Sequence, residues 1–181
     1  MKYSMNRAVF LDRDGVINRK LPEGQYVTYW EEMQFLPGVD MAIASLKRAG
    51  FRVIVVSNQR CVAKGLLTLR ELELIHQRML AELAAVGAVI DDIYCCPHEK
   101  QPPCSCRKPQ PGMLLSAAKA HGIDLSASWM IGDSESDVRA GKNAGCKTTR
   151  ILDSGEVANG MADLYAGSLI EAAQKILLLE P

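Results

Sequence analysis

The chain has 181 residues, 48% of them apolar, which suits one compact domain with a sizeable core and leaves too little for two. Its 21 basic side chains balance 21 acidic ones, so no overall field draws it to nucleic acid or to an anionic membrane. Residues 1–7 lead into a short apolar run, and no later run approaches the roughly 18 apolar residues of a membrane span. We therefore expect one soluble, cytoplasmic domain over residues 1–181, with no secretion signal, no nucleic-acid partner and no membrane partner.

Short apolar runs alternate with stretches of helical periodicity along the chain. The apolar runs predict buried strands at residues 8–11, 53–56, 88–93, 129–131 and, more weakly, 147–151. Helices are predicted from Pro37-Gly38 to Gly50, from Thr68 to Val86-Gly87, from Pro111 to Gly122, over residues 136–144 and over residues 168–179. Because parallel strands need helical crossovers, this alternation predicts an α/β fold with a doubly wound, Rossmann-like parallel sheet. Ligands of such sheets bind beyond the carboxyl ends of the strands.

Carboxylates follow two of the predicted strands. Asp12 and Asp14 come directly after the first strand, where Gly15 allows a sharp turn, and Asp133 follows the fourth strand. Clustered carboxylates repel one another unless a cation lies between them, and hard oxygen ligands suit magnesium. The pattern predicts a Mg²⁺ site in which one aspartate is a nucleophile toward phosphorus while the second gives and takes a proton.

Other polar side chains are suited to a phosphoryl group. Ser57 offers a hydroxyl and Asn58 an amide after the second predicted strand, and Lys108 supplies a positive charge further along the chain. Phosphoryl transfer depends mainly on such positioning and electrostatic stabilisation. The sequence therefore indicates an enzyme that acts on a phosphate ester.

Four of the six cysteines fall between residues 95 and 106, and in a reducing compartment such a cluster points to a metal before a disulfide. Three thiolates and one imidazole in a C-x-H-x₅-C-x-C arrangement complete a tetrahedral, structural zinc site, formed by Cys96, His98, Cys104 and Cys106. We expect this zinc to pin a loop, about residues 95–109, that delivers Arg107 and Lys108 to the active site. Cys95 would point the other way on an extended strand, so it is left out of the site.

The remaining cysteines and histidines have no partners at ligand spacing. Cys61 and Cys146 stand alone, and we expect both to fill the core. His76, inside a long predicted helix, and His121, at a helix end, are expected to be packing or surface residues.

The motifs stand in the order found in the haloacid dehalogenase superfamily, whose aspartate-nucleophile phosphatases this chain resembles. They are D-R-D-G at 12–15, S-N at 57–58, Lys108 and G-D-S-E-S-D at 132–137. A single D-x-D motif is weak evidence for this superfamily, whereas four motifs in order are strong evidence. The resemblance covers about residues 7–150, and neither gap between the motifs has room for a large cap domain. Because related sugar-phosphate mutases need a cap to exclude water, a hydrolase is favoured.

The resemblance implies a role for each matching position. Asp12 would form a covalent aspartyl-phosphate, and Asp14 would protonate the leaving oxygen and then activate the hydrolytic water. Ser57 and Lys108 would hold the phosphoryl oxygens. Mg²⁺ would be bound by the side chain of Asp12, the main-chain carbonyl of Asp14 and the side chain of Asp133. Asp137 would lie behind these ligands or merely begin the following helix.

The zinc loop, followed by R-K-P-Q-P-G-M at 107–113, resembles the subgroup that holds heptose 1,7-bisphosphate phosphatases and histidinol-phosphate phosphatases. The stretches 57–65 and 25–27 favour the heptose branch, which implies a phosphorylated sugar substrate from the biosynthesis of nucleotide-activated heptose for lipopolysaccharide core or S-layer glycan. Arg107 would bind the distal part of the substrate. The other expected substrate contacts are Arg13, Asn58, Gln59, Arg60 and Ser134. Ser134 stands where some members carry a lysine, and Arg60 is a candidate for the missing charge.

Two alternatives remain open at this point. One is a histidinol-phosphate phosphatase or another small phosphomonoester hydrolase. The other, from a different class, is a receiver-like or zinc-organised interaction module that uses its aspartate only as a phosphoacceptor, although a receiver has no need of Asp14 together with a zinc loop. We expect the protein to be a monomer.

Overall fold

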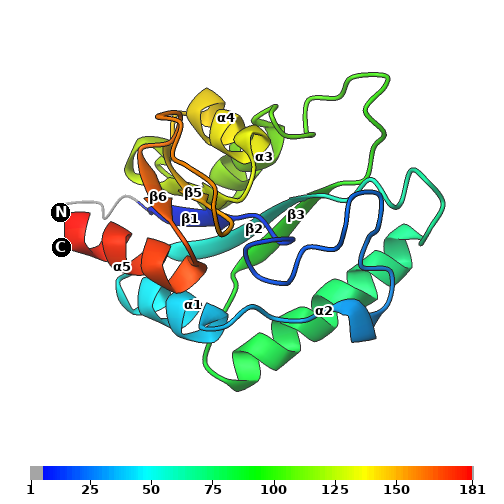
Figure 1. Ribbon diagram of the computed structural model, residues 1–181, viewed down its shortest axis with the longest axis horizontal. Coiled ribbons are helices and arrows are strands. Elements are labelled where there is room, and N and C mark those ends of the chain that lie inside the picture. Colours follow the sequence, from blue (N-terminus) through cyan, green and yellow to red (C-terminus); the bar gives the residue numbers. More distant parts are fainter. Residues whose placement is uncertain (1–5, 181) are drawn as a thin grey trace.

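A computed structural model describes residues 6–180, and the N-terminal residues 1–5, which enter the expectation about a secretion signal, lie outside the described part. One sheet of six parallel strands forms its centre, in the order β3-β2-β1-β4-β5-β6 (Figure 1). The strands are β1 Ala8–Leu11, β2 Arg52–Asn58, β3 Asp92–Cys96, β4 Trp129–Gly132, β5 Lys147–Ile151 and β6 Leu164–Ala166. The predicted doubly wound parallel sheet is confirmed.

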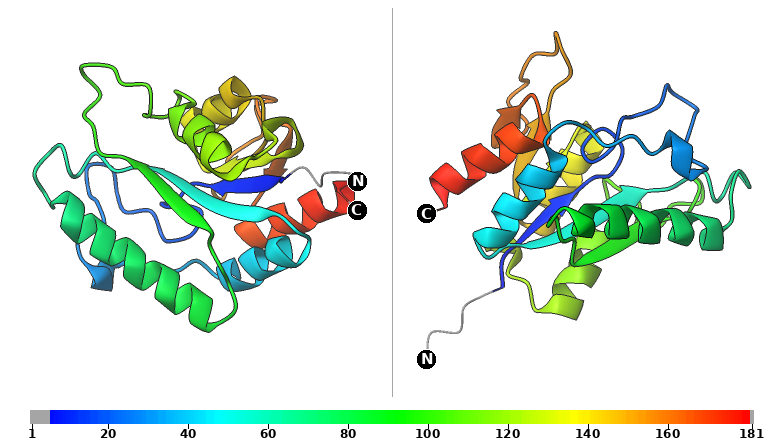
Figure 2. Two further views of the ribbon diagram at one scale, coloured as in Figure 1. Left: turned by 180° about the vertical axis from the view of Figure 1, so that it is seen from behind. Right: turned by 90° about the horizontal axis from the view of Figure 1, so that it is seen from below.

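Helices cover both faces of this sheet (Figures 1 and 2). They are α1 Val39–Arg48, α2 Leu69–Ala85, α3 Gly112–His121, α4 Glu135–Ala144 and α5 Leu169–Leu179, with short 3-10 turns at Trp30–Glu32 and Leu125–Ala127. Buried side chains of α1, α2 and α5 form one core with the sheet, and those of α3 and α4 form a second core on its other face. Among the described residues no cap domain interrupts this three-layer arrangement.

Alternation along the strands assigns each side chain to one of the two cores. In β1, Val9 and Leu11 belong to the core under α1, whereas Ala8 and Phe10 belong to the core under α3. Central parallel strands are covered on both faces, so they read as unbroken apolar runs. The same alternation separates the neighbours Cys95 and Cys96, which pack against opposite cores, as expected.

The third strand differs from its predicted position. The apolar run at 88–93 was expected to form it, but β3 pairs with β2 from Asp92, opposite Ile54, to Cys96, opposite Asn58. Ala88 and Ile90 are buried in the connection that precedes the strand, so burial alone made this run look like a strand. Both β2, which ends at Asn58, and β3, which ends at Cys96, extend further toward the carboxyl edge of the sheet than predicted. The edge strand β6 was not predicted, because three residues carry too little pattern.

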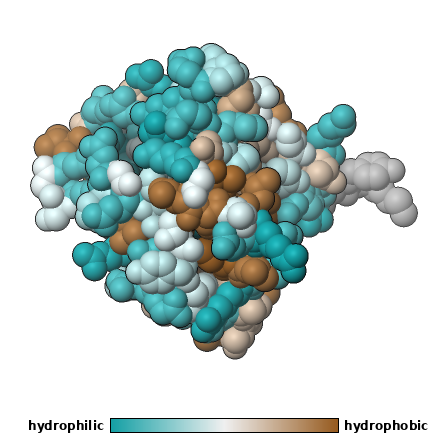
Figure 3. Space-filling model, turned by 90° about the vertical axis from the view of Figure 1, so that its right-hand side faces the viewer, coloured by the Kyte–Doolittle hydropathy of each residue, from teal (hydrophilic) through white to brown (hydrophobic). Residues whose placement is uncertain are grey.

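The described helices include none that combines the length and apolarity needed to cross a bilayer. The surface does carry a hollow of about 410 Å³ between α2 and the edge strand β3. Apolar side chains in its lining include Leu69, which is more than half exposed, Leu72 and Ile93. Figure 3 shows the apolar patch on this side of the molecule, which includes the beginning of α2.

Helix α2 begins at a capping box, as its sequence predicts. The hydroxyl of Thr68 accepts a hydrogen bond from the backbone N–H of Glu71 at 3.2 Å, and the Glu71 carboxylate accepts one from the backbone N–H of Thr68 at 2.7 Å. We predict that Thr68→Ala lowers the free energy of unfolding by about 1 kcal/mol, because the backbone N–H of Glu71 loses the hydroxyl that accepts its hydrogen bond. Urea denaturation measures this. Thr68→Ser, which keeps the hydroxyl, is the control, and an equal loss in both variants would contradict a capping role.

Candidate active site

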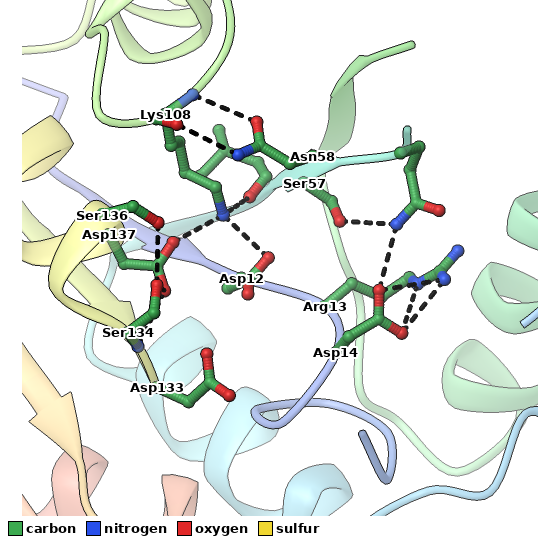
Figure 4. Close-up of polar contacts among 12 residues, drawn as sticks. Asp12, Arg13, Asp14, Ser57, Asn58, Lys108, Asp133, Ser134, Ser136 and Asp137 are labelled. Carbon is green, nitrogen blue, oxygen red and sulfur yellow. Dashed lines mark hydrogen bonds and ion pairs between the residues drawn. The ribbon is translucent and has the colours of Figure 1, made fainter. Parts of the chain in front are cut away.

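The motif residues meet at the carboxyl edge of the sheet, as Figure 4 shows. Asp12 directly follows β1, Ser57 and Asn58 end β2, and Asp133 directly follows β4. They line one pocket of about 670 Å³ together with Lys108. The other charged residues of its lining are Asp14, Lys20, Glu23, Lys100, Arg107 and Asp137.

Lys108 lies at the base of this pocket with only 2% of its side chain exposed. Its Nζ lies 2.8 Å from Oδ1 of Asp12 and 2.7 Å from Oδ1 of Asp137, and it donates to the carbonyl of Val56 at 2.8 Å. Burial alone would lower the pKa of Lys108, but the charges of Asp12 and then Asp137 outweigh it and raise the pKa above its ordinary value. Lys108 is therefore a fixed positive charge.

Asp12 is the most strongly perturbed carboxylate of the site. Burial raises its pKa to about 7, Lys108 opposes the shift, and the charges of Asp137, Asp133 and Asp14 add to it. Lys108 therefore does not balance all of the negative charge around Asp12. One carboxylate oxygen each from Asp12, Asp133 and Asp137 lie within 4.8 Å of one another, which is a donor set that suits a hard divalent cation.

Gly15 allows this close arrangement. Its backbone has φ +91°, and a Cβ atom at this position would lie 2.3 Å from Oδ2 of Asp133. A side chain here would therefore displace the carboxylate that approaches from the end of β4.

Asp14 is held by three donors that face away from the pocket. Nη2 of Arg13 lies 3.0 and 3.1 Å from its two oxygens, Nδ2 of Asn18 donates at 2.9 Å and Nε2 of Gln59 donates at 3.1 Å. Burial would raise the pKa of Asp14, but the charge of Arg13 and these hydrogen bonds lower it below its ordinary value. The same Gln59 nitrogen lies 2.7 Å from Oγ of Ser57, so one amide links two site residues.

Several expected substrate contacts occupy other positions. Arg13 and Gln59 are each 1% exposed and lie behind Asp14, outside the lining of the pocket, so they support the site instead of reaching into it. Arg60 forms an ion pair with Glu99 and is likewise absent from the lining. Its side chain pairs with this carboxylate, outside the lining that contains Ser134.

Asn58 and Ser134 line the pocket but are engaged by backbone groups or neighbours. The Asn58 amide accepts from the backbone N–H of Lys108 at 3.0 Å and donates to the Lys108 carbonyl at 3.2 Å, which holds the loop against β2. The Ser134 hydroxyl donates to Oδ2 of Asp137 at 2.6 Å, and the same oxygen accepts from the backbone N–H of Ser134 at 3.1 Å in the capping box of α4. Asp137 thus caps α4 and forms an ion pair with Lys108, and it also lines the pocket beside Asp12 and Asp133.

The four predicted zinc ligands lie together at the end of β3. One ligand atom each of Cys96, His98, Cys104 and Cys106 fall within 4.8 Å of one another. Sγ of Cys106 lies 3.2 Å from Sγ of Cys96 and 3.2 Å from Nδ1 of His98, and Cys96 and Cys104 are 3.6 Å apart. Three thiols and an imidazole converging at this spacing fit a tetrahedral zinc ion. The isolated Cys61 and Cys146 are buried in the core, as expected.

Sequence reasoning missed Lys20. Its Nζ lies 2.5 Å from Oδ2 of Asp133, and it joins Lys100 and Arg107 as the further cations of the pocket lining. A single lysine in the loop after β1 carries no pattern that would mark it. Sequence reasoning also missed the partners of the isolated histidines: His76 Nε2 lies 3.1 Å from Nη1 of Arg13, and His121 pairs with Asp92 at 2.8 Å.

Comparison with known proteins agrees with this geometry. A family model described as "HAD-hyrolase-like" matches residues 105–163. The D-glycero-beta-D-manno-heptose-1,7-bisphosphate 7-phosphatase of Rhodopseudomonas palustris is 43% identical over 145 residues, which cover 76% of this chain and 79% of the relative. The D-glycero-alpha-D-manno-heptose-1,7-bisphosphate 7-phosphatase of Mycobacterium bovis is 36% identical over 91% of this chain and 88% of the relative.

A solved structure is similar over nearly the whole chain. The D,D-heptose 1,7-bisphosphate phosphatase from B. bronchiseptica, complexed with magnesium and phosphate, superposes with a TM-score of 0.84 at 33% identity and covers 96% of this chain and 99% of its own. These levels of identity and coverage confirm the predicted resemblance. The chain therefore belongs to the same family as these phosphatases, within the haloacid dehalogenase superfamily.

Proposed function

We propose that this protein is a Mg²⁺-dependent phosphatase that removes the 7-phosphate of D-glycero-D-manno-heptose 1,7-bisphosphate during the biosynthesis of nucleotide-activated heptose. The observation that carries the proposal is Asp12, a buried carboxylate beside the fixed charge of Lys108, at the base of a pocket with a basic rim. The names of the relatives support the substrate.

The reaction would proceed in two displacements on phosphorus. An oxygen of Asp12 attacks the phosphoryl group and forms an aspartyl-phosphate, while Asp14 gives a proton to the sugar oxygen as its bond to phosphorus breaks. Asp14 must enter this step protonated, against the lowered pKa that Arg13 and the amide donors cause. Asp14 then takes a proton from water, which attacks the same phosphorus and releases phosphate and free Asp12. Lys108, with Ser57, stabilises the phosphoryl oxygens throughout.

A bound Mg²⁺ ion would add to the positive charge that Lys108 provides. The side chains of Asp12 and Asp133 and the carbonyl of Asp14 would hold Mg²⁺, which supplies positive charge to the transferring phosphoryl group. The raised pKa of Asp12 fits such a site, because a carboxylate that is short of positive charge gains most from a cation.

The basic side chains at the rim of the pocket would bind the second phosphate of the substrate. Lys100 and Arg107 line the same pocket and are at least partly exposed, and Lys20, an exposed lysine of the lining, pairs with Asp133. Lys108, by contrast, is buried between two aspartates. A bisphosphate presents a second dianion that these cations suit. Histidinol phosphate lacks this second phosphate, so the rim favours the sugar bisphosphate.

The four-ligand cluster would hold a structural zinc ion. The loop between β3 and α3 has no strand or helix of its own, and its Lys108 must stay in place beside Asp12. Zinc at Cys96, His98, Cys104 and Cys106 would close the loop from the last residue of β3 onward. We further infer that residues 1–181 act as a single phosphatase domain, as a monomer in the cytoplasm.

A substrate panel tests the proposed function. With Mg²⁺ present, we predict that one anomer of heptose 1,7-bisphosphate has a kcat/KM at least about a hundredfold above those of histidinol phosphate and fructose 1,6-bisphosphate, because only the correct bisphosphate reaches both ends of the pocket. Phosphate release, measured by a colorimetric assay, gives these values. An equal or higher value for histidinol phosphate would overturn the heptose assignment.

The nucleophile has its own test. Asp12→Asn should abolish turnover of every substrate while the protein stays folded, because an amide is a far weaker nucleophile and a poorer Mg²⁺ ligand. Circular dichroism checks the fold, and Glu23→Gln, which changes an exposed acid of the same lining, is the control. Turnover of Asp12→Asn within tenfold of wild type, a barrier change below about 1.4 kcal/mol, would remove the assignment.

Metal removal separates the two proposed ions. Dialysis against a mild chelator should strip Mg²⁺ and stop catalysis reversibly, while elemental analysis still finds about one zinc per chain, because thiolates hold zinc far more tightly. Cys104→Ser should lose zinc and activity together. Cys95→Ser, next to the cluster but on the other face of β3, should keep both. Zinc-free wild-type protein with full activity would contradict a structural zinc.

A further inference from the structure

His76 is a buried imidazole that the proposed reaction does not use. It lies on α2, is 7% exposed, and its Nε2 is 3.1 Å from Nη1 of Arg13. A guanidinium can only donate hydrogen bonds, so Nε2 of His76 must be the acceptor and the ring proton must lie on Nδ1. Burial, and then the charge of Arg13, lower the pKa of His76 to about 3, so the ring stays neutral near pH 7.

Arg13 connects this imidazole to the carboxylate of Asp14. The guanidinium is 1% exposed, and its Nη2 contacts both oxygens of Asp14 while Nε lies 3.3 Å from Oδ1. A guanidinium is a rigid planar fork, so the direction of Nη1 determines the direction of the other two nitrogens. The bond to His76 therefore limits the rotation of the fork that holds Asp14.

A neutral acceptor suits this position better than the alternatives. A carboxylate in place of the imidazole would compete with Asp14 for the charge of Arg13. An apolar side chain would leave Nη1 of Arg13 buried without a partner from α2, which is costly for a charged group. Asn18 and Gln59 also hold Asp14, but neither fixes the guanidinium.

We propose that His76 is a positioning residue, which orients Arg13 so that Asp14 is held where it can protonate the leaving oxygen of the substrate. The inference rests on the proposed role of Asp14 as the general acid and extends it to a residue outside the pocket.

Substrates with different leaving groups distinguish a positioning role of His76 from a packing role. A sugar oxygen is a poor leaving group and needs the proton from Asp14, whereas p-nitrophenolate leaves without one. The ratio kcat/KM covers only the steps up to release of the alcohol, so hydrolysis of the aspartyl-phosphate, which both substrates share, does not enter it. A misplaced acid should therefore slow the sugar phosphate and spare the aryl phosphate, while a general packing defect should slow both.

The experiment compares His76→Leu, His76→Gln and Asp14→Asn with the wild type on heptose 1,7-bisphosphate and p-nitrophenyl phosphate. For His76→Leu we expect kcat/KM to fall about 10- to 100-fold on the sugar bisphosphate and no more than about threefold on the aryl phosphate. His76→Gln, whose amide oxygen can accept from Arg13, should recover most of the loss. Asp14→Asn should show the same selectivity, more strongly. Thermal melts establish that each variant folds.

The outcomes separate this inference from the proposed function. If Asp14→Asn is selective but His76→Leu slows both substrates equally or neither, the positioning role is wrong. If Asp14→Asn shows no selectivity, or if the wild type hydrolyses neither compound, the proposed general acid fails and the inference fails with it.

A measurement on the wild type requires no variant to fold. Nitrogen-15 NMR of the histidine rings should show His76 neutral, with its proton on Nδ1 and a bare Nε2. A proton on Nε2 would overturn the inference, because Arg13 could not then donate to that nitrogen.

Discussion

The active site depends on one buried positive charge. Lys108 lies between Asp12 and Asp137, and a third bond to the Val56 carbonyl places its ammonium beside β2. Without that charge Asp12 and Asp137 would lie close together with no cation between them to oppose their repulsion. Each strand contributes to the arrangement: β1 presents Asp12, β4 leads to the helix that carries Asp137, and β2 supplies the carbonyl.

Two attachments hold the loop that carries Lys108 in place. Asn58 uses both ends of its amide on the backbone of Lys108, and the Cys-His cluster gathers the loop from the last residue of β3 onward. The lysine itself is far from Asp12 in sequence, so its position depends on these two attachments. This explains why a cluster with no contact to the substrate belongs in the description of the active site.

Patterned features were predictable from the sequence. The strand ends with their aspartates, the capping box of α2 and the C-x-H-x₅-C-x-C spacing each combine a residue type with a fixed interval, and the structure places them accordingly. The third strand was misplaced because a buried connection is as apolar as a buried strand. Only pairing with β2 distinguishes them, and pairing is not a local property.

The directions of polar side chains were the feature that the sequence predicted least well. Arg13 is next to Asp12, the proposed nucleophile, so we expected it to contact the substrate. The chain bends directly after β1, and Arg13 lies outside the lining of the pocket, where it contacts His76 and Asp14. Lys20 went unnoticed because its neighbour Asp133 is distant in sequence. Contacts of this kind exist only once the sheet has formed.

Lys108 allows the carboxylates of Asp12 and Asp137 to be buried together. The most direct measurement is the free energy of unfolding of Lys108→Met in protein freed of Mg²⁺ but not of zinc, with Lys100→Met, an exposed lysine of the same lining, as reference. We predict that the free energy of unfolding falls by about 3 kcal/mol or more for Lys108→Met, is partly restored by Mg²⁺, and changes by less than about 0.5 kcal/mol for Lys100→Met. Equal stabilities of the two variants would contradict it.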